Sequence, residues 1–164
     1  MTITKIHNKN LELIDLVKNY LPEKEVVSIK KALDFAHDSH KNQKRISGEP
    51  YIIHPVSTAF HLAKMRLDSE TIQAGLLHDV IEDCGVSHEE LAENFNINIA
   101  NLVDGVTKLK KLDMIPTNSK MIKQYTKHET SRSASLRKML VAMAEDTRVV
   151  LIKLADRLHN METL

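Results

Sequence analysis

The densest group of ionisable side chains lies in residues 76–85, where an apolar run leads into one histidine and three carboxylates. In a helix, residues three or four positions apart share a face. His78 then lies beside Glu82, and Asp79 lies beside both Glu82 and Asp83, before a glycine ends the helix. Carboxylates this close repel one another and lose hydration when they are half buried, and a bound cation relieves both costs. The pattern therefore predicts a metal site.

Two residues far away in the sequence are candidates for the missing ligands. His54 is followed by Pro55, which suits the first position of a helix, so its imidazole is either a ligand on rigid backbone or a solvated loop histidine. Asp156 lies in an otherwise apolar helix, where a carboxylate needs a partner. That partner is either a metal or a structural ion pair with Arg157 or Arg148. Two imidazoles and two carboxylates suit Mn, Fe or Zn rather than Ca or Cu(I).

Length and composition narrow the class of protein. The 164 residues are enough for one domain. Because 23 basic residues balance 22 acidic ones, the charge of the chain does not indicate direct nucleic-acid binding. The apolar runs are much shorter than the ~18 residues that span a bilayer, and the N-terminus lacks the apolar region of a signal peptide. One cysteine excludes an intrachain disulfide and fits a reducing compartment. We therefore expect a cytoplasmic protein without membrane contact.

Apolar residues recur at helical spacing through most of the chain. This predicts an all-α bundle of about eight or nine helices. The expected helices are a short one around residues 11–17, then 23–41, 56–65, 69–83, 87–95 and 99–108, one beginning at residue 136 and a last one from residue 147. Residues 51–53 are expected to be briefly extended. Apolar periodicity fades in residues 113–135, which we expect to form a mobile loop.

Four motifs together indicate a family. His54, the pair His78-Asp79 and the distant Asp156 match the H…HD…D signature of the HD-domain metal phosphohydrolases. The surrounding sequence resembles the hydrolase domain of RelA/SpoT-type stringent-response proteins, from about residue 25 onward, in motifs at residues 45–55, 77–83, 104–109 and 148–161. The resemblance implies an HD-domain helical bundle over residues 1–164. The 104–109 motif is more similar to long, bifunctional members, so the chain is expected to be an N-terminal fragment of one.

The resemblance also implies an activity and a set of site residues. The activity is Mn²⁺-dependent removal of the 3′-pyrophosphate from guanosine tetra- and pentaphosphate (ppGpp and pppGpp), which releases GDP or GTP. The family's metal ligands map onto His54, His78, Asp79 and Asp156. Its catalytic acidic pair maps onto Glu82 and Asp83, and its nucleotide contacts map onto Arg45, Ser47, Asn160 and Thr163.

The residues themselves suggest how this chemistry is divided. Glu82 is one helical turn from His78, close enough to orient a water or take its proton; alternatively, Glu82 and Asp83 only support the ligand histidines. Lys44 and Arg45, together with Lys41, supply local positive charge for an anionic substrate, unless the loop is simply a solvated basic segment. Tyr51 is one of several side chains that could stack on guanine.

Several positions depart from the family pattern. Ile46 stands where a second basic or polar residue is common, Glu162 stands where arginine is usual, and residues 127–135 match poorly. Two other functions remain alternatives: an HD phosphohydrolase acting on another nucleotide, and a catalytically silent module that binds the alarmone. The intact His78-Asp79 and Glu82-Asp83 pairs favour an enzyme. The sequence leaves the oligomeric state open.

Overall fold

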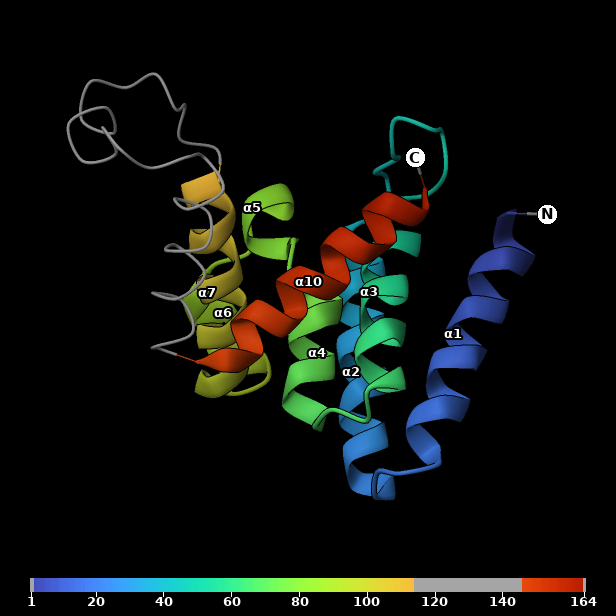
Figure 1. Cartoon of the computed structure of the whole chain (residues 1–164), viewed down its shortest axis with the longest axis horizontal. Coiled ribbons are helices and arrows are strands. Elements are labelled where there is room, and N and C mark those ends of the chain that lie inside the picture. The colour runs from blue at the N-terminus through green and yellow to red at the C-terminus, as the bar shows by residue number, and fades with distance from the viewer. Residues whose placement is uncertain (1, 114–145, 164) are drawn as a thin grey trace, which may run out of the picture.

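The computed structural model describes residues 2–113 and 146–163, and every regular element in these residues is a helix (Figure 1). The helices are α1 (Thr2–Lys18), α2 (Glu23–Ser39), α3 (Ile53–Lys64), α4 (Ser69–Leu77), α5 (Val80–Cys84), α6 (His88–Asn94), α7 (Ile97–Asp113) and α10 (Thr147–Glu162). The predicted all-α class is confirmed. The predicted helix from residue 136 and nearly all of the predicted loop at 113–135 lie outside the described residues. None of the described helices is long and apolar enough to cross a membrane.

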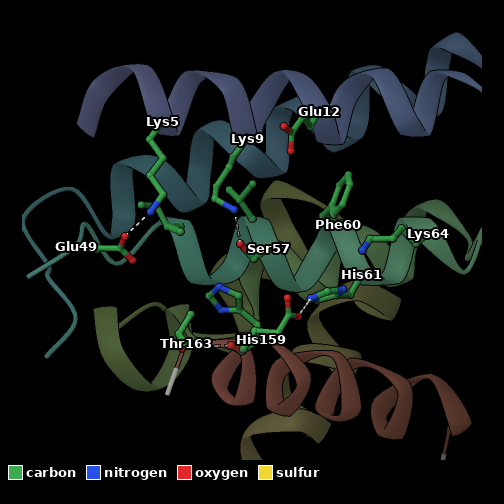
Figure 2. A pocket seen from close by; sticks show the side chains of 13 residues that line it. Lys5, Lys9, Glu12, Glu49, Ser57, Phe60, His61, Lys64, His159 and Thr163 are labelled. Atoms are coloured by element: carbon green, nitrogen blue, oxygen red, sulfur yellow. Dashed lines mark hydrogen bonds and ion pairs between the residues drawn. The ribbon is translucent and has the colours of Figure 1, made fainter. Parts of the chain in front are cut away.

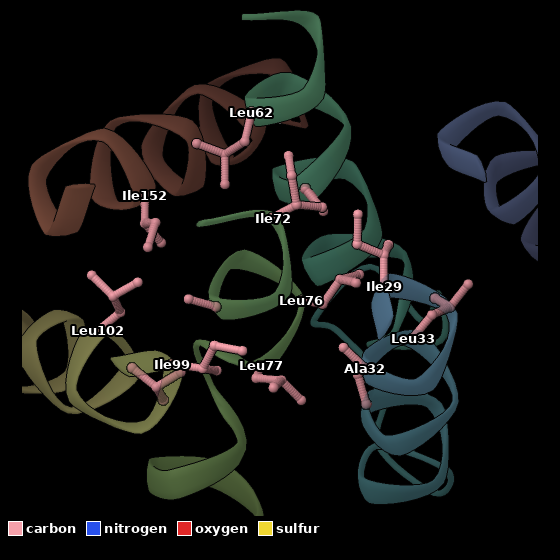
Figure 3. Packing of buried hydrophobic residues seen from close by; sticks show 14 of the residues in the cluster. Ile29, Ala32, Leu33, Leu62, Ile72, Leu76, Leu77, Ile99, Leu102 and Ile152 are labelled. Atoms are coloured by element: carbon pink, nitrogen blue, oxygen red, sulfur yellow. The ribbon is translucent and has the colours of Figure 1, made fainter. Parts of the chain in front are cut away.

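Helix α4 is the centre of the core because its sequence is apolar or small on nearly every side. All of its residues except Glu70 are buried, and it packs against α2, α3, α7 and α10. Figure 3 shows Ile72, Leu76 and Leu77 of α4 among buried side chains that come from all four of these helices. A helix buried all round cannot tilt independently of its neighbours. Its C-terminal end is therefore a fixed point from which functional side chains can be presented.

Two glycines allow α4 and α10 to pack closely against their neighbours. A Cβ atom at Gly75 would lie 2.6 Å from Leu62 Cδ1, so glycine allows α4 to approach α3 closely. At Gly105 a Cβ atom would lie 2.8 Å from Val149 Cγ2, where α7 meets α10. In Figure 1, α10 crosses the bundle diagonally, and it packs against α3, α4 and α7. The last described helix is thus positioned by three helices from earlier in the chain.

The prediction of one helix over residues 69–83 is wrong at one point. Helix α4 ends at Leu77, and a new short helix, α5, begins at Val80. Asp79, with φ −103° and ψ −4°, forms the junction, and its side chain caps no backbone N–H of α5. Its carboxylate instead accepts a hydrogen bond from the Tyr51 hydroxyl and lies 3.0 Å from His78 Nε2. These tertiary contacts outweigh the local preference for a continuous helix.

Other helix ends follow the sequence more closely. Asp68 and Ser87 cap α4 and α6 through the backbone N–H groups of residues 71 and 90, and Gly85 ends α5 with φ +68°. Helix α3, however, starts at Ile53, so the extended segment predicted there is wrong and Pro55 lies inside the first turn. A proline fits there because the first N–H groups of a helix have no intrahelical partner. Helices α1 and α7 are longer than predicted.

Candidate metal centre

Three parts of the chain bring four predicted ligands together. His54 lies in the first turn of α3, His78 and Asp79 form the junction between α4 and α5, and Asp156 lies in the middle of α10. We refer to these four side chains as the ligand cluster. All four are buried, with exposed fractions of 2–7%. Residues that are 102 positions apart in the sequence therefore meet in an interior that largely excludes solvent.

The polar atoms of the ligand cluster converge. His54 Nε2 lies 2.6 Å from Asp156 Oδ1, and His78 Nε2 lies 3.4 Å from the same oxygen. Asp79 Oδ2 lies 3.0 Å from His78 Nε2 and 3.9 Å from His54 Nε2. One ligand atom from each of His54, His78 and Asp156 falls within 4.8 Å of the others. These three donors, with the Asp79 carboxylate beside the two imidazoles, make a nitrogen–oxygen donor set for a divalent cation.

His78 carries the clearest sign of a metal ligand. Its Nδ1 lies 2.6 Å from the carbonyl oxygen of Gly75, which can only accept, so Nδ1 carries the proton. Its Nε2 is buried and, among the described residues, has no hydrogen-bond partner despite two carboxylate oxygens within 3.4 Å. A buried nitrogen that lies close to carboxylates without hydrogen-bond geometry is suited to a shared cation. The residues present therefore fit a metal ion.

The electrostatics of the cluster fit the same reading. Burial lowers the pKa of His78, but the Asp79 and Asp156 carboxylates outweigh it and raise this pKa to about 10. Burial raises the pKa of both carboxylates, but the two histidines reverse this and hold each pKa well below its usual range. Both carboxylates thus stay ionised in a buried site. Such a site strongly attracts positive charge, which a metal ion can supply in place of a proton.

Each carboxylate of the cluster has further support. The Tyr51 hydroxyl donates to Asp79 Oδ2 at 2.6 Å, and the Lys153 ammonium lies 3.2 Å from Asp156 Oδ2. The alternative that Asp156 pairs with Arg148 is wrong, since that guanidinium binds acidic residues at positions 68, 70 and 146. Partners that orient metal ligands in this way commonly set metal affinity.

The predicted catalytic pair lies on α5, one turn beyond the ligands. Lys110 of α7 lies 3.3 Å from Glu82 Oε2 and 3.9 Å from Asp79 Oδ1, so it bridges Glu82 to the ligand cluster. Desolvation and the nearby Asp79 charge raise the pKa of Asp83, although Lys110 opposes them. Gln43 binds the carbonyl oxygen of Asp83 and fixes the backbone of α5. Both carboxylates thus lie at the edge of the cluster.

The five predicted substrate-binding residues share one cavity. The cavity has a volume of about 650 Å³ and is lined by Lys44, Arg45, Ile46, Ser47, Tyr51, Asn160 and Thr163. We refer to it as the Arg45 cavity. Arg45 donates to Asn160 Oδ1 at 2.8 Å, which ties the basic loop to α10. The loop itself is held by a hydrogen bond from the Gly48 N–H to the Arg45 carbonyl, with Gly48 at φ +88°. Residues 44–47 and Tyr51 thus form a single surface with Asn160 and Thr163 beside the ligand cluster.

Comparison with known proteins identifies the family. The family model described as "HD domain" matches residues 32–164. The chain belongs to the HD-domain family. It is 48% identical to a guanosine-3′,5′-bis(diphosphate) 3′-pyrophosphohydrolase of Vibrio cholerae and 45% identical to the bifunctional (p)ppGpp synthase/hydrolase SpoT of Escherichia coli K12, over 93% of this chain in both cases. It is 44% identical over 95% of its length to a Brucella melitensis protein named GTP pyrophosphokinase rsh. The chain spans about a fifth of the length of these relatives.

Sequence reasoning about this HD domain missed three supporting side chains. His159 lies 2.7 Å from His54 and 3.4 Å from Arg45, Lys110 contacts Glu82, and Lys153 contacts Asp156. Two of them were recognisable in principle: Lys153 and His159 lie three residues on either side of Asp156, hence on its helix face. Lys110 has no such local signal because it reaches the site from α7.

Two departures from the family pattern have a structural explanation. Glu162 forms an ion pair with His61 of α3 and lines a separate pocket between α1, α3 and α10 (Figure 2). It therefore adds no negative charge to the lining of the Arg45 cavity. Ile46 is fully exposed at the tip of the basic loop. An apolar side chain there costs the HD domain little, because it displaces no buried contact.

Proposed function

We propose that this chain is a Mn²⁺-dependent hydrolase that removes the 3′-pyrophosphate from guanosine tetra- and pentaphosphate. The products are GDP or GTP and pyrophosphate. The observation that carries the proposal is the adjacency of a buried histidine–aspartate cluster and a cavity lined by Lys44 and Arg45. The names of the Vibrio and Escherichia relatives supply the substrate class. We place the activity in residues 1–164 as one hydrolase domain, and its site of action in the cytoplasm.

The ligand cluster would hold the metal ion through His54, His78, Asp79 and Asp156. When bound, a divalent cation supplies positive charge that lowers the pKa of a water and offsets charge on phosphate oxygens. Two imidazoles and two carboxylates suit Mn, Fe or Zn, and among these we favour Mn²⁺ because the resemblance to RelA/SpoT-type hydrolases implies it. The buried environment strengthens these electrostatic interactions, since little solvent competes with them.

Glu82 takes the role of general base. A water attacks the phosphorus attached to the 3′-oxygen, and Glu82 accepts the proton that the water loses. The bond between this phosphorus and the 3′-oxygen breaks. The 3′-oxygen takes up a proton from solvent and becomes the 3′-hydroxyl of GDP or GTP. The phosphorus, which now carries the oxygen of the water, leaves as part of pyrophosphate, and Glu82 returns its proton to solvent. The contact of Lys110 with Glu82 fixes the direction of the carboxylate. Asp83 orients the attacking water from the neighbouring position on α5.

The Arg45 cavity takes the nucleotide. Arg45 presents a planar guanidinium that can grip two phosphate oxygens, and Lys44 adds a second positive charge. Ser47, Asn160 and Thr163 offer neutral hydrogen-bonding groups on the cavity wall. The Tyr51 hydroxyl cannot donate a hydrogen bond to guanine, because it already donates its proton to Asp79. The pentaphosphate and the tetraphosphate differ only at their 5′ ends. Both therefore present the same 3′-pyrophosphate to the site.

A direct assay tests the proposal. Purified protein is incubated with ppGpp and MnCl₂, and pyrophosphate and GDP are measured over time. We expect stoichiometric GDP and pyrophosphate, with no turnover after treatment with EDTA and recovery on adding Mn²⁺ back. Release of single phosphates, or no release with any of Mn²⁺, Mg²⁺, Zn²⁺ and Fe²⁺, would refute this function. Cyclic nucleotides and nucleoside 5′-phosphates serve as competing substrates and should remain intact.

A further inference from the structure

His159 lies between the two halves of the site. Its exposed fraction is 6%, and its Nδ1 lies 2.7 Å from His54 Nδ1 and 3.4 Å from Arg45 Nη1. The rings of His54 and His159 are tilted by 30° with centroids 5.0 Å apart. Figure 2 shows the His159 ring facing the inner side of α3. One nitrogen atom therefore touches both a predicted metal ligand and a predicted substrate-binding residue.

The proton positions follow from the partners. A guanidinium can only donate, so the His159 nitrogen that faces Arg45 is an acceptor. A histidine that offers Nε2 to a metal keeps its proton on Nδ1 and donates it outward. With a metal in place of the proton between His54 Nε2 and Asp156, His54 Nδ1 would donate to His159 Nδ1, and His159 would carry its own proton on Nε2.

We propose that His159 is a positioning residue whose Nδ1 accepts hydrogen bonds from both His54 and Arg45, and so aligns the metal ligand with the phosphate-binding arginine. The other contacts of these residues do not replace this one. His54 Nε2 faces Asp156, and in the part of the chain that the structure describes the other hydrogen bond of the Arg45 guanidinium is to Asn160. Without the acceptor at position 159, the His54 ring loses its outer hydrogen bond. The Arg45 part of the inference rests on the proposed function, whereas the His54 part does not.

Three substitutions separate this role from simple packing. In His159→Asn the amide oxygen occupies nearly the place of Nδ1 and can accept both hydrogen bonds. In His159→Leu the volume is filled but no acceptor remains. In His159→Gln the amide group reaches toward the place of Nε2 instead. His37→Leu, at an exposed position of α2, serves as the matched control for loss of an imidazole.

The first readout is Mn²⁺ affinity, measured from the electron paramagnetic resonance signal of the free ion, which needs no substrate. We expect His159→Leu and His159→Gln to bind Mn²⁺ about 10–100-fold more weakly, as for other partners of metal ligands. His159→Asn should stay within about threefold of the parent chain, and His37→Leu should match it. Unchanged affinity in the leucine variant, or equal losses in the leucine and asparagine variants, would overturn the inference. Thermal melting of each variant without metal checks that the fold persists.

The second readout is nucleotide affinity in a Glu82→Gln background, where turnover is arrested. Binding of ppGpp at saturating Mn²⁺ should weaken in His159→Leu and recover in His159→Asn. If ppGpp binds none of the proteins, the proposed function fails while the Mn²⁺ result still decides the role of His159 toward His54. If ppGpp binds the leucine variant as tightly as the parent, the link to Arg45 is wrong.

Discussion

The ligand cluster and the Arg45 cavity are built in opposite ways. Each ligand is at most 7% exposed and has a second hydrogen bond or ion pair that fixes its direction. Most of the cavity residues are exposed, and Ile46 has no buried contact at all. The difference indicates that the geometry for chemistry is set before any ligand arrives, whereas the substrate surface can adjust. Changes in the cluster should thus affect metal binding and kcat, and changes in the cavity should affect KM.

Asp79→Ala should have the largest effect, because it removes a proposed metal ligand and leaves His78 without its nearest counter-charge. We expect no bound Mn²⁺ by elemental analysis and no measurable ppGpp hydrolysis. Asp38→Ala, at an exposed position of α2, is the matched control and should keep both. Full metal content in Asp79→Ala would remove this residue from the ligand cluster.

Glu82→Gln should separate chemistry from metal binding. The amide has nearly the same shape but cannot accept a proton, so kcat should fall by about 10²–10⁴-fold. Mn²⁺ content should remain that of the parent chain, since in the described residues the link from Glu82 to the cluster runs through Lys110. Glu89→Gln in the first turn of α6 is the control. Metal loss in Glu82→Gln would instead make this carboxylate a ligand or an essential support.

Arg45→Lys keeps the charge of the cavity but loses the planar fork. The hydrogen bonds of a guanidinium to phosphate are worth about 1.5–3 kcal/mol, so KM for ppGpp should rise by about 10–100-fold with a smaller change in kcat. Steady-state kinetics at saturating Mn²⁺ measures both. Arg66→Lys, at the far end of α3, should leave KM unchanged. A loss confined to kcat would contradict the division between cluster and cavity.

Tyr51→Phe gives the smallest of the four effects and tests the boundary between the two regions. Tyr51 lines the cavity, yet its hydroxyl binds Asp79 at 2.6 Å. We expect Mn²⁺ affinity to fall by about tenfold with little change in KM. Tyr20→Phe is a close control, because the Tyr20 hydroxyl also makes one hydrogen bond, to the Leu67 carbonyl, away from the site. Both variants should lose similar thermal stability, and only Tyr51→Phe should lose metal affinity.

Much of the fold was predictable because its signals are local. The spacing of apolar residues, the caps at Asp68 and Ser87 and the stop at Gly85 depend on neighbours within one helical turn. The break at Asp79 was not predictable in this way. It depends on Tyr51, which lies 28 residues earlier in the chain and has no pattern in common with the helix it interrupts.

The residues of the candidate site also fall into those that the sequence predicted and those that only packing brings to the site. His54, His78, Asp79 and Asp156 were found as a set because the family pattern fixes their order, although spacing alone left Asp156 open to an ion pair. Lys110 was missed because Leu109 and the residues before it read as an ordinary helix face, and only the packing of α7 beside α5 brings its ammonium to Glu82. Contacts between distant helices are properties of the packed bundle, which no short motif encodes.

Helix α10 also fixes the distance between the two parts of the candidate site. Asp156 belongs to the ligand cluster, and Thr163, seven residues later at the C-cap of the helix, lines the Arg45 cavity. With a rise of 1.5 Å per residue, the two positions are about 10 Å apart along the helix axis. A ligand that reaches both must span that length, whereas a free phosphate or pyrophosphate is too short. On the proposed function, the fixed spacing along α10 would favour a whole nucleotide over its pyrophosphate product.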